Sequence, residues 1–469
     1  MTHNFYKTLL LVLITPLVLY AQAGKPGYLQ LIQYQGLYQY SNNTTLKFAA
    51  SPKDSLLYAI INESRYPLRP QGNDNFLNNS NELVHFTRDS KNNLNGYVIG
   101  RDTFKLINKD VSFPKTMWYP RMVVHPEVYG YKYHQPAQIK DGVSTSSLTG
   151  TSLDARLLAD MMHKIFKGDY PNVRSVLIMK DGKLVFEEYF YDYTRDRLQE
   201  MRSASKSVIS ALTGIALQQK VLPSINAKLN DLLPQYHWKN PSPLKDRITL
   251  QDMLDNQTGV AYDAANPKLG GNETAMGNSP DWIQYTYDLP IIDTPGKVGR
   301  YNSGNPITIG RIIELYAKSP LRDYAAKNLF GPLGITDFTW NFKPDPSNAE
   351  NFCQVYLTPR DMAKFGQLYL QDGVWNGRQI VPKKWVQEST AKHSVVQGVD
   401  YGYFWWLKHL DTPNKSYQTF AAQGNGGQKI YVFRKLNMVV ITTGGNYNSQ
   451  SPSDEIIQKY ILPAFDAKK

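Results

Sequence analysis

A serine and a lysine three residues apart form the first pair in the chain whose types and spacing suggest chemistry. They are Ser203 and Lys206, in the run Met201-Arg-Ser-Ala-Ser-Lys-Ser207. At this spacing on a helix the two side chains lie on one face, about one turn apart. A serine hydroxyl beside a desolvated lysine is a nucleophile with a proton acceptor next to it. The pair predicts covalent catalysis, but the pattern alone is unspecific because serine and lysine are common where helices begin.

The residues that follow this pair predict a core helix. In the run 208–217, apolar residues recur with the spacing of one buried helix face. A helix N-terminus carries unpaired amides and a partial positive charge. We therefore expect Ser203 to lie where a developing oxyanion would be stabilised.

The N-terminal segment has the pattern of a secretory signal peptide. Lys7 precedes the apolar residues 9–20, a stretch too short to span a bilayer, and Ala21-Gln-Ala23 fits a small-x-small cleavage site. We expect removal of residues 1–23, no integral membrane segment after cleavage, and a periplasmic or secreted location in a bacterium. The net charge of +12 then predicts attraction to an anionic cell envelope, and no nucleic-acid partner.

The composition of the chain also bears on metals, cofactors and redox chemistry. Cys353 is the single cysteine, so it excludes an internal disulfide and a cysteine-cluster metal site. The eight histidines are scattered and show no ligand spacing. The sequence therefore predicts no metal and no cofactor.

Four segments are expected from the order of patterns along the chain: a signal peptide (1–23), a β-rich accessory domain (24–120), a surface linker (121–152) and the main domain (153–469). Short alternating runs separated by turn clusters predict a meander or small barrel in the accessory domain.

The main domain shows the pattern of an α+β fold. An amphipathic run at 153–166 predicts a helix, and two β-rich runs flank the turn Lys180-Asp-Gly-Lys183, a strong hairpin signal. Residues 430–433 and 438–443 are predicted to form neighbouring strands, which follow a glycine-rich turn. We predict an antiparallel sheet flanked by helices, with an all-α lobe.

With these segments in order, residues from about 150 onward resemble the serine hydrolases of the β-lactamase and penicillin-binding-protein superfamily. The likeness is greatest to the class C-like branch that contains esterases and 6-aminohexanoate-dimer hydrolase. The matching motifs are Ser203-Ala-Ser-Lys206, Tyr301-Asn-Ser303, Pro295-Gly296, Ile248-Thr249 with Thr258-Gly259, Thr358-Pro-Arg-Asp361 with Phe365-Gly366, Tyr401-Gly402 with Trp405-Trp406, and the turn 424–428.

The resemblance implies a mechanism. Tyr301 would face Ser203 and Lys206, and with Lys206 it would relay the serine proton to the leaving group. Ser203 would form an acyl-enzyme that water hydrolyses. The resemblance also implies that the backbone amide of Ser203 and one near Gly424, that of Asn425, hold the oxyanion. Ser303 would bind substrate or assist the relay, or be an ordinary hydrogen-bonded serine.

One departure from the family pattern bears on the substrate. The third motif, Lys-Thr-Gly in β-lactamases, is here Ala422-Gln423-Gly424, so the lysine that would anchor a β-lactam carboxylate is missing. We expect an exported hydrolase of a small-molecule amide or ester. One alternative is a β-lactamase or D-amino-acid peptidase anchored by Arg300 or Lys429, and another is a non-catalytic envelope binding or sensor protein. The substrate, the role of the accessory domain and the oligomeric state stay open at this point.

Overall fold

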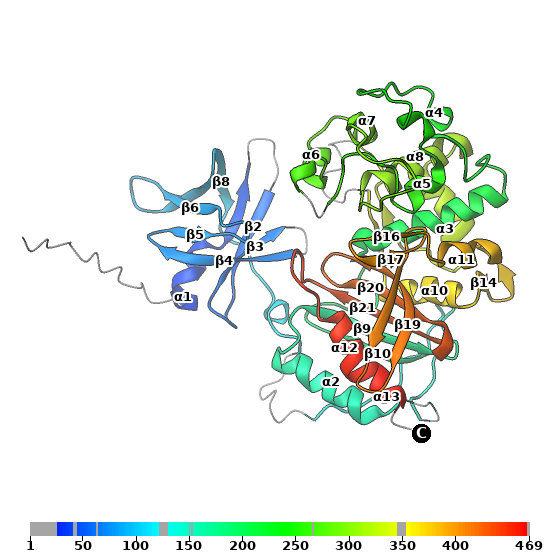
Figure 1. The fold of residues 1–469 in the computed structure, drawn as a ribbon. Helices are drawn as coiled ribbons and strands as arrows, with labels where there is room; N and C mark the ends of the chain where they lie inside the picture. The colour runs from blue at the N-terminus through cyan, green and yellow to red at the C-terminus, as the bar shows by residue number, and fades with distance from the viewer. Residues whose placement is uncertain are drawn as a thin grey trace, which may run out of the picture. The chain divides into compact units, whose positions relative to one another are not determined.

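The computed structural model describes two compact units (Figure 1). It covers residues 26–40, 45–61, 64–121, 130–149, 151, 153–264, 267–344 and 353–466. The described residues up to Phe113 form the first unit, and those from Pro114 onward form the second. The predicted signal peptide lies outside the described residues, and the other segment boundaries expected from the sequence stay predictions.

The first unit is a closed barrel of eight antiparallel strands preceded by the short helix α1 (Tyr28–Leu31). Aromatic rings fill its interior: Tyr38 packs edge-on against both Phe48 and Tyr97. Closure of the barrel leaves no unpaired sheet edge. The prediction of a β-rich meander or barrel is therefore confirmed. The strands are β1 (Gly36–Gln39), β2 (Thr45–Ala50), β3 (Leu57–Ile61), β4 (Ser64–Gly72), β5 (Asn75–Leu77), β6 (Leu83–Arg88), β7 (Leu94–Ile99) and β8 (Asp102–Asn108).

An eight-stranded antiparallel sheet forms the middle layer of the second unit, in the order β10-β9-β21-β20-β19-β18-β17-β16. The predicted hairpin forms its first two strands, and β21 pairs with β9, with Val440 opposite Ile178. The strands are β9 (Val173–Lys180), β10 (Lys183–Tyr189), β16 (Ser394–Val396), β17 (Val399–Tyr401), β18 (Trp406–Asp411), β19 (Ser416–Gly424), β20 (Gln428–Phe433) and β21 (Met438–Gly444).

Two smaller sheets complete the strands of this unit. One has the order β11-β13-β12 and the other is the pair β14-β15. Their bounds are β11 (Gln199–Glu200), β12 (Thr339–Trp340), β13 (Val355–Leu357), β14 (Val374–Trp375) and β15 (Arg378–Gln379).

Helices cover both faces of the large sheet, and alternate strand residues belong to different cores (Figure 1). On β19 and β20, Ala422 and Ile430 pack into the core that contains α3 (Ser205–Gln218), α8 (Gly304–Ala317) and α10 (Pro359–Leu370). Their neighbours Ala421 and Tyr431 pack into the core that contains α2 (Ala155–Lys167) and α13 (Leu462–Asp466). The period of two along a strand explains this division.

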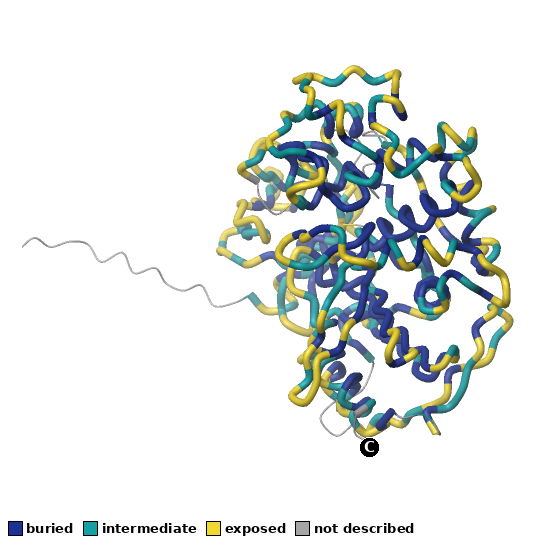
Figure 2. Tube along the Cα trace, turned by 45° about the vertical axis from the view of Figure 1, so that its right-hand side comes forward, coloured by how far each residue is buried: buried dark blue, intermediate teal, exposed yellow. Residues whose placement is uncertain are grey.

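Burial is concentrated in the sheet and in the helices packed against it (Figure 2). An all-α lobe stands on one side, so the predicted fold class is confirmed. The helices of this unit are α2 (Ala155–Lys167), α3 (Ser205–Gln218), α4 (Leu229–Leu232), α5 (Leu250–Leu254), α6 (Glu273–Gly277), α7 (Trp282–Asp288), α8 (Gly304–Ala317), α9 (Leu321–Ala325), α10 (Pro359–Leu370), α11 (Lys383–Ser389), α12 (Ser453–Ile456) and α13 (Leu462–Asp466).

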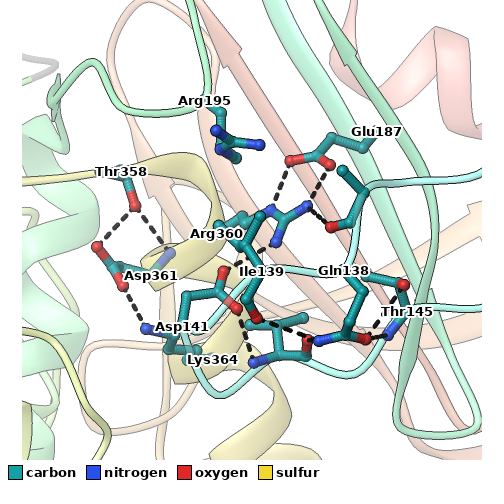
Figure 3. A network of polar contacts seen from close by, with 12 residues as sticks. Gln138, Ile139, Asp141, Thr145, Glu187, Arg195, Thr358, Arg360, Asp361 and Lys364 are labelled. Atoms are coloured by element: carbon teal, nitrogen blue, oxygen red, sulfur yellow. Dashed lines mark hydrogen bonds and ion pairs between the residues drawn. The ribbon is translucent and has the colours of Figure 1, made fainter.

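A buried arginine fastens residues 130–149 to the edge of this sheet (Figure 3). Arg360 of α10 donates two hydrogen bonds to the Glu187 carboxylate of β10, at 2.7 and 2.6 Å, and one to Asp141, at 2.9 Å. A fourth reaches the carbonyl of Ala137. These bonds satisfy a guanidinium that is almost wholly buried, as a charge in the interior requires.

No helix in the described part of the chain is both long and apolar enough to cross a membrane.

Candidate active site

The predicted nucleophile lies at a sharp turn that leads into the core helix. Arg202, Ser203 and Ala204 form a 3-10 turn, and α3 continues from Ser205. Arg202 has a φ of 50°, in the left-handed region that costs a residue with a side chain about 1–2 kcal/mol. Such strain commonly marks functional sites. The turn leaves Ser203 half-buried on a pocket wall, while most of α3 is inaccessible.

Lys206 brings its ammonium group to the serine hydroxyl. Its Nζ donates a hydrogen bond to Ser203 Oγ at 2.8 Å, as expected for neighbours on one helix face. The lysine side chain is buried, with 6% of its surface exposed. The same Nζ lies 4.9 Å from the centre of the Tyr301 ring, within the range of a cation–π contact. Serine, lysine and tyrosine therefore converge, although about 95 residues separate the first two from the third.

Tyr301 is positioned by Asn256, a residue that sequence reasoning missed. The side-chain oxygen of Asn256 accepts a hydrogen bond from the Asn302 amide at 3.3 Å and one from the Asn305 side chain at 3.0 Å. Its carbonyl accepts the Arg300 amide at 2.9 Å. Asn256 thus holds the residues on both sides of Tyr301, and it is itself buried in the left-handed conformation that asparagine tolerates.

The end of β19 closes the site on the other side of the serine. Gly424 lies so close to the serine turn that a Cβ there would be 2.2 Å from the Met201 carbonyl oxygen. Asn425 follows on the pocket wall, and its side chain exchanges hydrogen bonds with Asn448, donating at 2.7 Å and accepting at 2.9 Å. Gly424 and Asn425, the region expected to supply the second oxyanion amide, therefore lie beside the predicted nucleophile.

A pocket of about 680 Å³, open mouth included, lies beside these groups, and neither Tyr301 nor Gly424 is among the residues that line it. The predicted residues on its wall are Ser203, Lys206, Ser303 and Asn425. The Ser303 hydroxyl donates a hydrogen bond to the carboxylate of Glu273, another wall residue that the sequence gave no reason to select. The remaining wall residues are Arg202, Ser205, Ile209, Met276, Pro306, Ile307, Phe342, Cys353 and Gln354.

The cations expected to anchor a substrate carboxylate are engaged elsewhere. Arg300 pairs with Asp293, at 2.8 and 2.7 Å, and Lys429 pairs with Asp454 at 3.0 Å. Neither is among the residues of the pocket wall. Lys429 follows the alternation of β20, so it faces away from α3.

The two tryptophans of the motif Tyr401-Gly-Tyr-Phe-Trp405-Trp406 have different surroundings. Trp405 is fully buried and packs on the ring of Tyr369. Trp406 is partly exposed, and its ring centre lies 5.6 Å from that of Tyr301. Core packing therefore explains Trp405, while Trp406 packs near the predicted catalytic tyrosine.

Within the described ranges, no cluster of three or more histidine, cysteine, aspartate or glutamate side chains could hold a metal ion.

Comparison with known proteins identifies the family of this chain. The sequence profile of the Beta-lactamase family matches residues 156–456, which is more than half of the chain. The chain belongs to the Beta-lactamase family. The prediction of a serine hydrolase of the β-lactamase and penicillin-binding-protein superfamily is thereby confirmed at the level of the family.

Individual relatives of this Beta-lactamase-family chain are distant. The lovastatin esterase of Penicillium rubens is 25% identical over 194 residues, which cover 38% of this chain and 48% of the esterase. The chain thus spans about half the length of that relative. An uncharacterized protein of Alkalihalophilus pseudofirmus is 22% identical over 301 residues, covering 59% of this chain and 84% of that protein.

Solved structures of the same fold include amidases and esterases. A D-amino acid amidase from Ochrobactrum anthropi has a TM-score of 0.53 at 15% identity, covering 67% of this chain and 99% of the amidase. A proposed 6-aminohexanoate-dimer hydrolase from Bacillus anthracis has a TM-score of 0.51 at 21% identity, with coverage of 64% and 81%. At these identities the likeness establishes the fold.

Proposed function

We propose that the chain is an exported serine hydrolase that cleaves an amide or ester bond of a small molecule through an acyl-serine. The observation that carries the proposal is the 2.8 Å hydrogen bond between Lys206 Nζ and Ser203 Oγ on a pocket wall, with the Tyr301 ring against the same Nζ. The nucleophile and the proton-transfer groups therefore lie together beside a pocket that a substrate could enter.

In the proposed first half-reaction, Ser203 Oγ attacks the substrate carbonyl carbon and its proton passes to the Lys206–Tyr301 pair. The carbonyl oxygen becomes an oxyanion, which the backbone amides of Ser203 and Asn425 would stabilise. As the tetrahedral intermediate collapses, the bond to the amine or alcohol breaks and the pair returns the proton to that leaving group.

In the second half-reaction, water attacks the acyl-serine. The same pair takes a proton from the water and returns it to Ser203 Oγ as the acid leaves. Support for this relay comes from the burial of Lys206, whose Nζ is hydrogen-bonded to Ser203 Oγ and lies 4.9 Å from the centre of the Tyr301 ring.

The pocket favours an amide or ester without an obligatory carboxylate over a β-lactam. Arg300 and Lys429, the cations suggested for a carboxylate anchor, are paired with Asp293 and Asp454 outside the pocket wall. We therefore expect turnover of short acyl esters and little turnover of a chromogenic cephalosporin.

The test is covalent labelling with a fluorophosphonate, measured as a mass shift of the intact protein. We expect labelling of the wild type and none of Ser203→Ala. Ser210→Ala is the matched control, because Ser210 is a fully buried serine of α3 that does not line the pocket. Labelling that survives Ser203→Ala would refute the assignment of the nucleophile, and an unlabelled wild type would favour a binding or sensor protein.

Export is proposed from the first 23 residues. When the full chain is expressed in a bacterium, we expect the mature protein in the periplasm or medium, with Gly24 as its first residue. Retention of the uncleaved chain in the cytoplasm would contradict this proposal.

A further inference from the structure

Tyr447 lies where two sides of the candidate active site meet. It belongs to the segment between β21 and α12, and it is buried, with 5% of its surface exposed. Its ring contacts Arg202, in the turn that carries the nucleophile, and Gly426, in the turn that carries Asn425. These two turns are the segments expected to supply the oxyanion amides.

The contact with the serine turn is a cation–π interaction. Arg202 directly precedes Ser203, and its guanidinium carbon lies 4.9 Å from the centre of the Tyr447 ring. Attraction between a cation and an aromatic face extends to about 6 Å. Arg202 also forms an ion pair with Glu200 at 3.0 Å. Because its φ of 50° is strained for a residue with a side chain, contacts with its guanidinium help to hold the turn in this conformation.

The contact with the turn after β19 is steric. A Cβ on Gly426 would lie 2.8 Å from Cε1 of Tyr447, so the ring packs directly against the glycine backbone. The amide of Asn446 donates a hydrogen bond to the Gly426 carbonyl at 3.0 Å. On the other side of Tyr447, Asn448 exchanges hydrogen bonds with the Asn425 side chain. Residues 446–448 therefore hold this turn in place.

A buried arginine of the large sheet fixes the ring itself. Arg174 of β9 has 1% of its surface exposed, and its Nη1 donates a hydrogen bond to the Tyr447 hydroxyl at 3.0 Å. Its guanidinium carbon lies 5.3 Å from the ring centre. The ring is thus attached to a strand inside the sheet, which is a more rigid support than a loop.

We propose that Tyr447 is a positioning residue that sets the distance between the backbone amides of Ser203 and Asn425, and hence the geometry of the oxyanion site. The proposal rests on the serine hydrolase function proposed above. An oxyanion donor acts only within hydrogen-bond distance of the developing charge, so a small shift of either turn removes its effect. Tyr447 does not line the pocket, and it acts through Arg202 and Gly426.

The first experiment compares two substitutions that both remove the hydroxyl and its hydrogen bond from Arg174. Tyr447→Phe keeps the ring beside Arg202, whereas Tyr447→Leu removes it. We expect both variants to be less stable than the wild type, but only Tyr447→Leu to lose activity. Its kcat on a short ester should fall about 10- to 100-fold with little change in KM, and its rate of fluorophosphonate labelling should fall by the same factor. Equal kcat values in the two variants would overturn the proposal.

Tyr193→Leu is the matched control. Tyr193 is also buried, and its ring centre lies 4.3 Å from the guanidinium carbon of the same Arg174, but it does not line the pocket. Its replacement should lower stability and leave kcat near that of the wild type. An equal loss of kcat in Tyr193→Leu and Tyr447→Leu would trace the loss to Arg174 or to stability, and the positioning role would be refuted.

The second experiment needs no catalysis. A double-mutant cycle of Tyr447→Leu and Arg202→Met, measured by denaturant unfolding of the inactive Ser203→Ala protein, isolates the contact between the two side chains. The Arg202 side chain is 19% exposed, so we expect coupling that changes the unfolding equilibrium constant about two- to fivefold. Absence of coupling would overturn the proposal even in an active enzyme. The proposed function fails instead when the wild type is not labelled, so the two failures are distinguishable.

Discussion

Replacing Gly424 by alanine tests whether the end of β19 forms part of the catalytic site. The added Cβ would lie 2.2 Å from the Met201 carbonyl oxygen and 2.9 Å from the Arg202 Cβ, whereas real Cβ atoms essentially never come within 3.0 Å of such neighbours. The strand and the serine turn must therefore separate by about 0.8 Å. A misplacement of about 1 Å can lower activity about 100-fold, because catalysis depends on the geometry of attack.

The assay for Gly424→Ala is the second-order rate of fluorophosphonate labelling, together with kcat/KM on a short ester. We expect both to fall about 100-fold while the protein stays folded. Gly366→Ala is the matched control, because the atoms nearest its Cβ would be side-chain atoms of Val439 and Ile430, at 2.5 and 2.8 Å. That overpacking should cost about 1–3 kcal/mol of stability and leave the labelling rate near that of the wild type.

Two results would refute the reasoning about Gly424. One is labelling of Gly424→Ala at the wild-type rate, which would mean that the predicted oxyanion region does not influence acylation. The other is a loss of activity in both glycine variants in proportion to their loss of stability, which would trace the effect to unfolding.

Three further predictions concern two residues near the site and the buried arginine at the edge of the sheet. Burial raises the pKa of Asp255 to about 8, so the folded chain keeps a proton that the unfolded chain releases, and stability falls as the pH rises from about 4 to 8. Asp255→Asn should abolish this dependence of stability on pH, which is about 1.4 kcal/mol per pH unit. Denaturant titrations at several pH values measure it, and an equal dependence in the wild type and the variant would contradict the prediction. Asn256→Ala removes the acceptor that fixes the residues after Tyr301, so kcat should fall at least about tenfold with a smaller change in KM, and an unchanged kcat would exclude the positioning role. Arg360→Met leaves Glu187 and Asp141 without their cation and should cost about 3–5 kcal/mol in the free energy of unfolding. Adding Glu187→Gln should recover part of this loss; no recovery would show that the ion pair is not its source.

Local patterns predicted much of the fold. The turn Lys180-Asp-Gly-Lys183 identified the hairpin of β9 and β10, and the runs at 430–433 and 438–443 identified neighbouring strands. Such features depend on period and turn chemistry within a few residues. The serine and the lysine could be predicted for the same reason, since their spacing places them on one helix face.

The residues that sequence reasoning missed depend on contacts between distant segments. Asn256 and Glu273 are single polar residues with no periodic or motif signal, and only the folded chain brings them to Tyr301 and Ser303. Tyr301 itself was placed beside the serine only through the family resemblance. The proposed anchors Arg300 and Lys429 illustrate the same limit, because sequence position did not reveal that Asp293 and Asp454 already bind them.

The pairing of β9 with β21 has a consequence for biosynthesis. Lys180 lies opposite Met438, so roughly 260 residues must be made before this central ladder can close, and a loop of that length carries a substantial entropy of closure. Contacts so distant in sequence also slow folding. A chain still emerging from the ribosome would hold Ser203 and Lys206 long before the strands that support them exist. The nascent hydrolase would therefore stay inactive and dependent on protection from aggregation until β21 is synthesised.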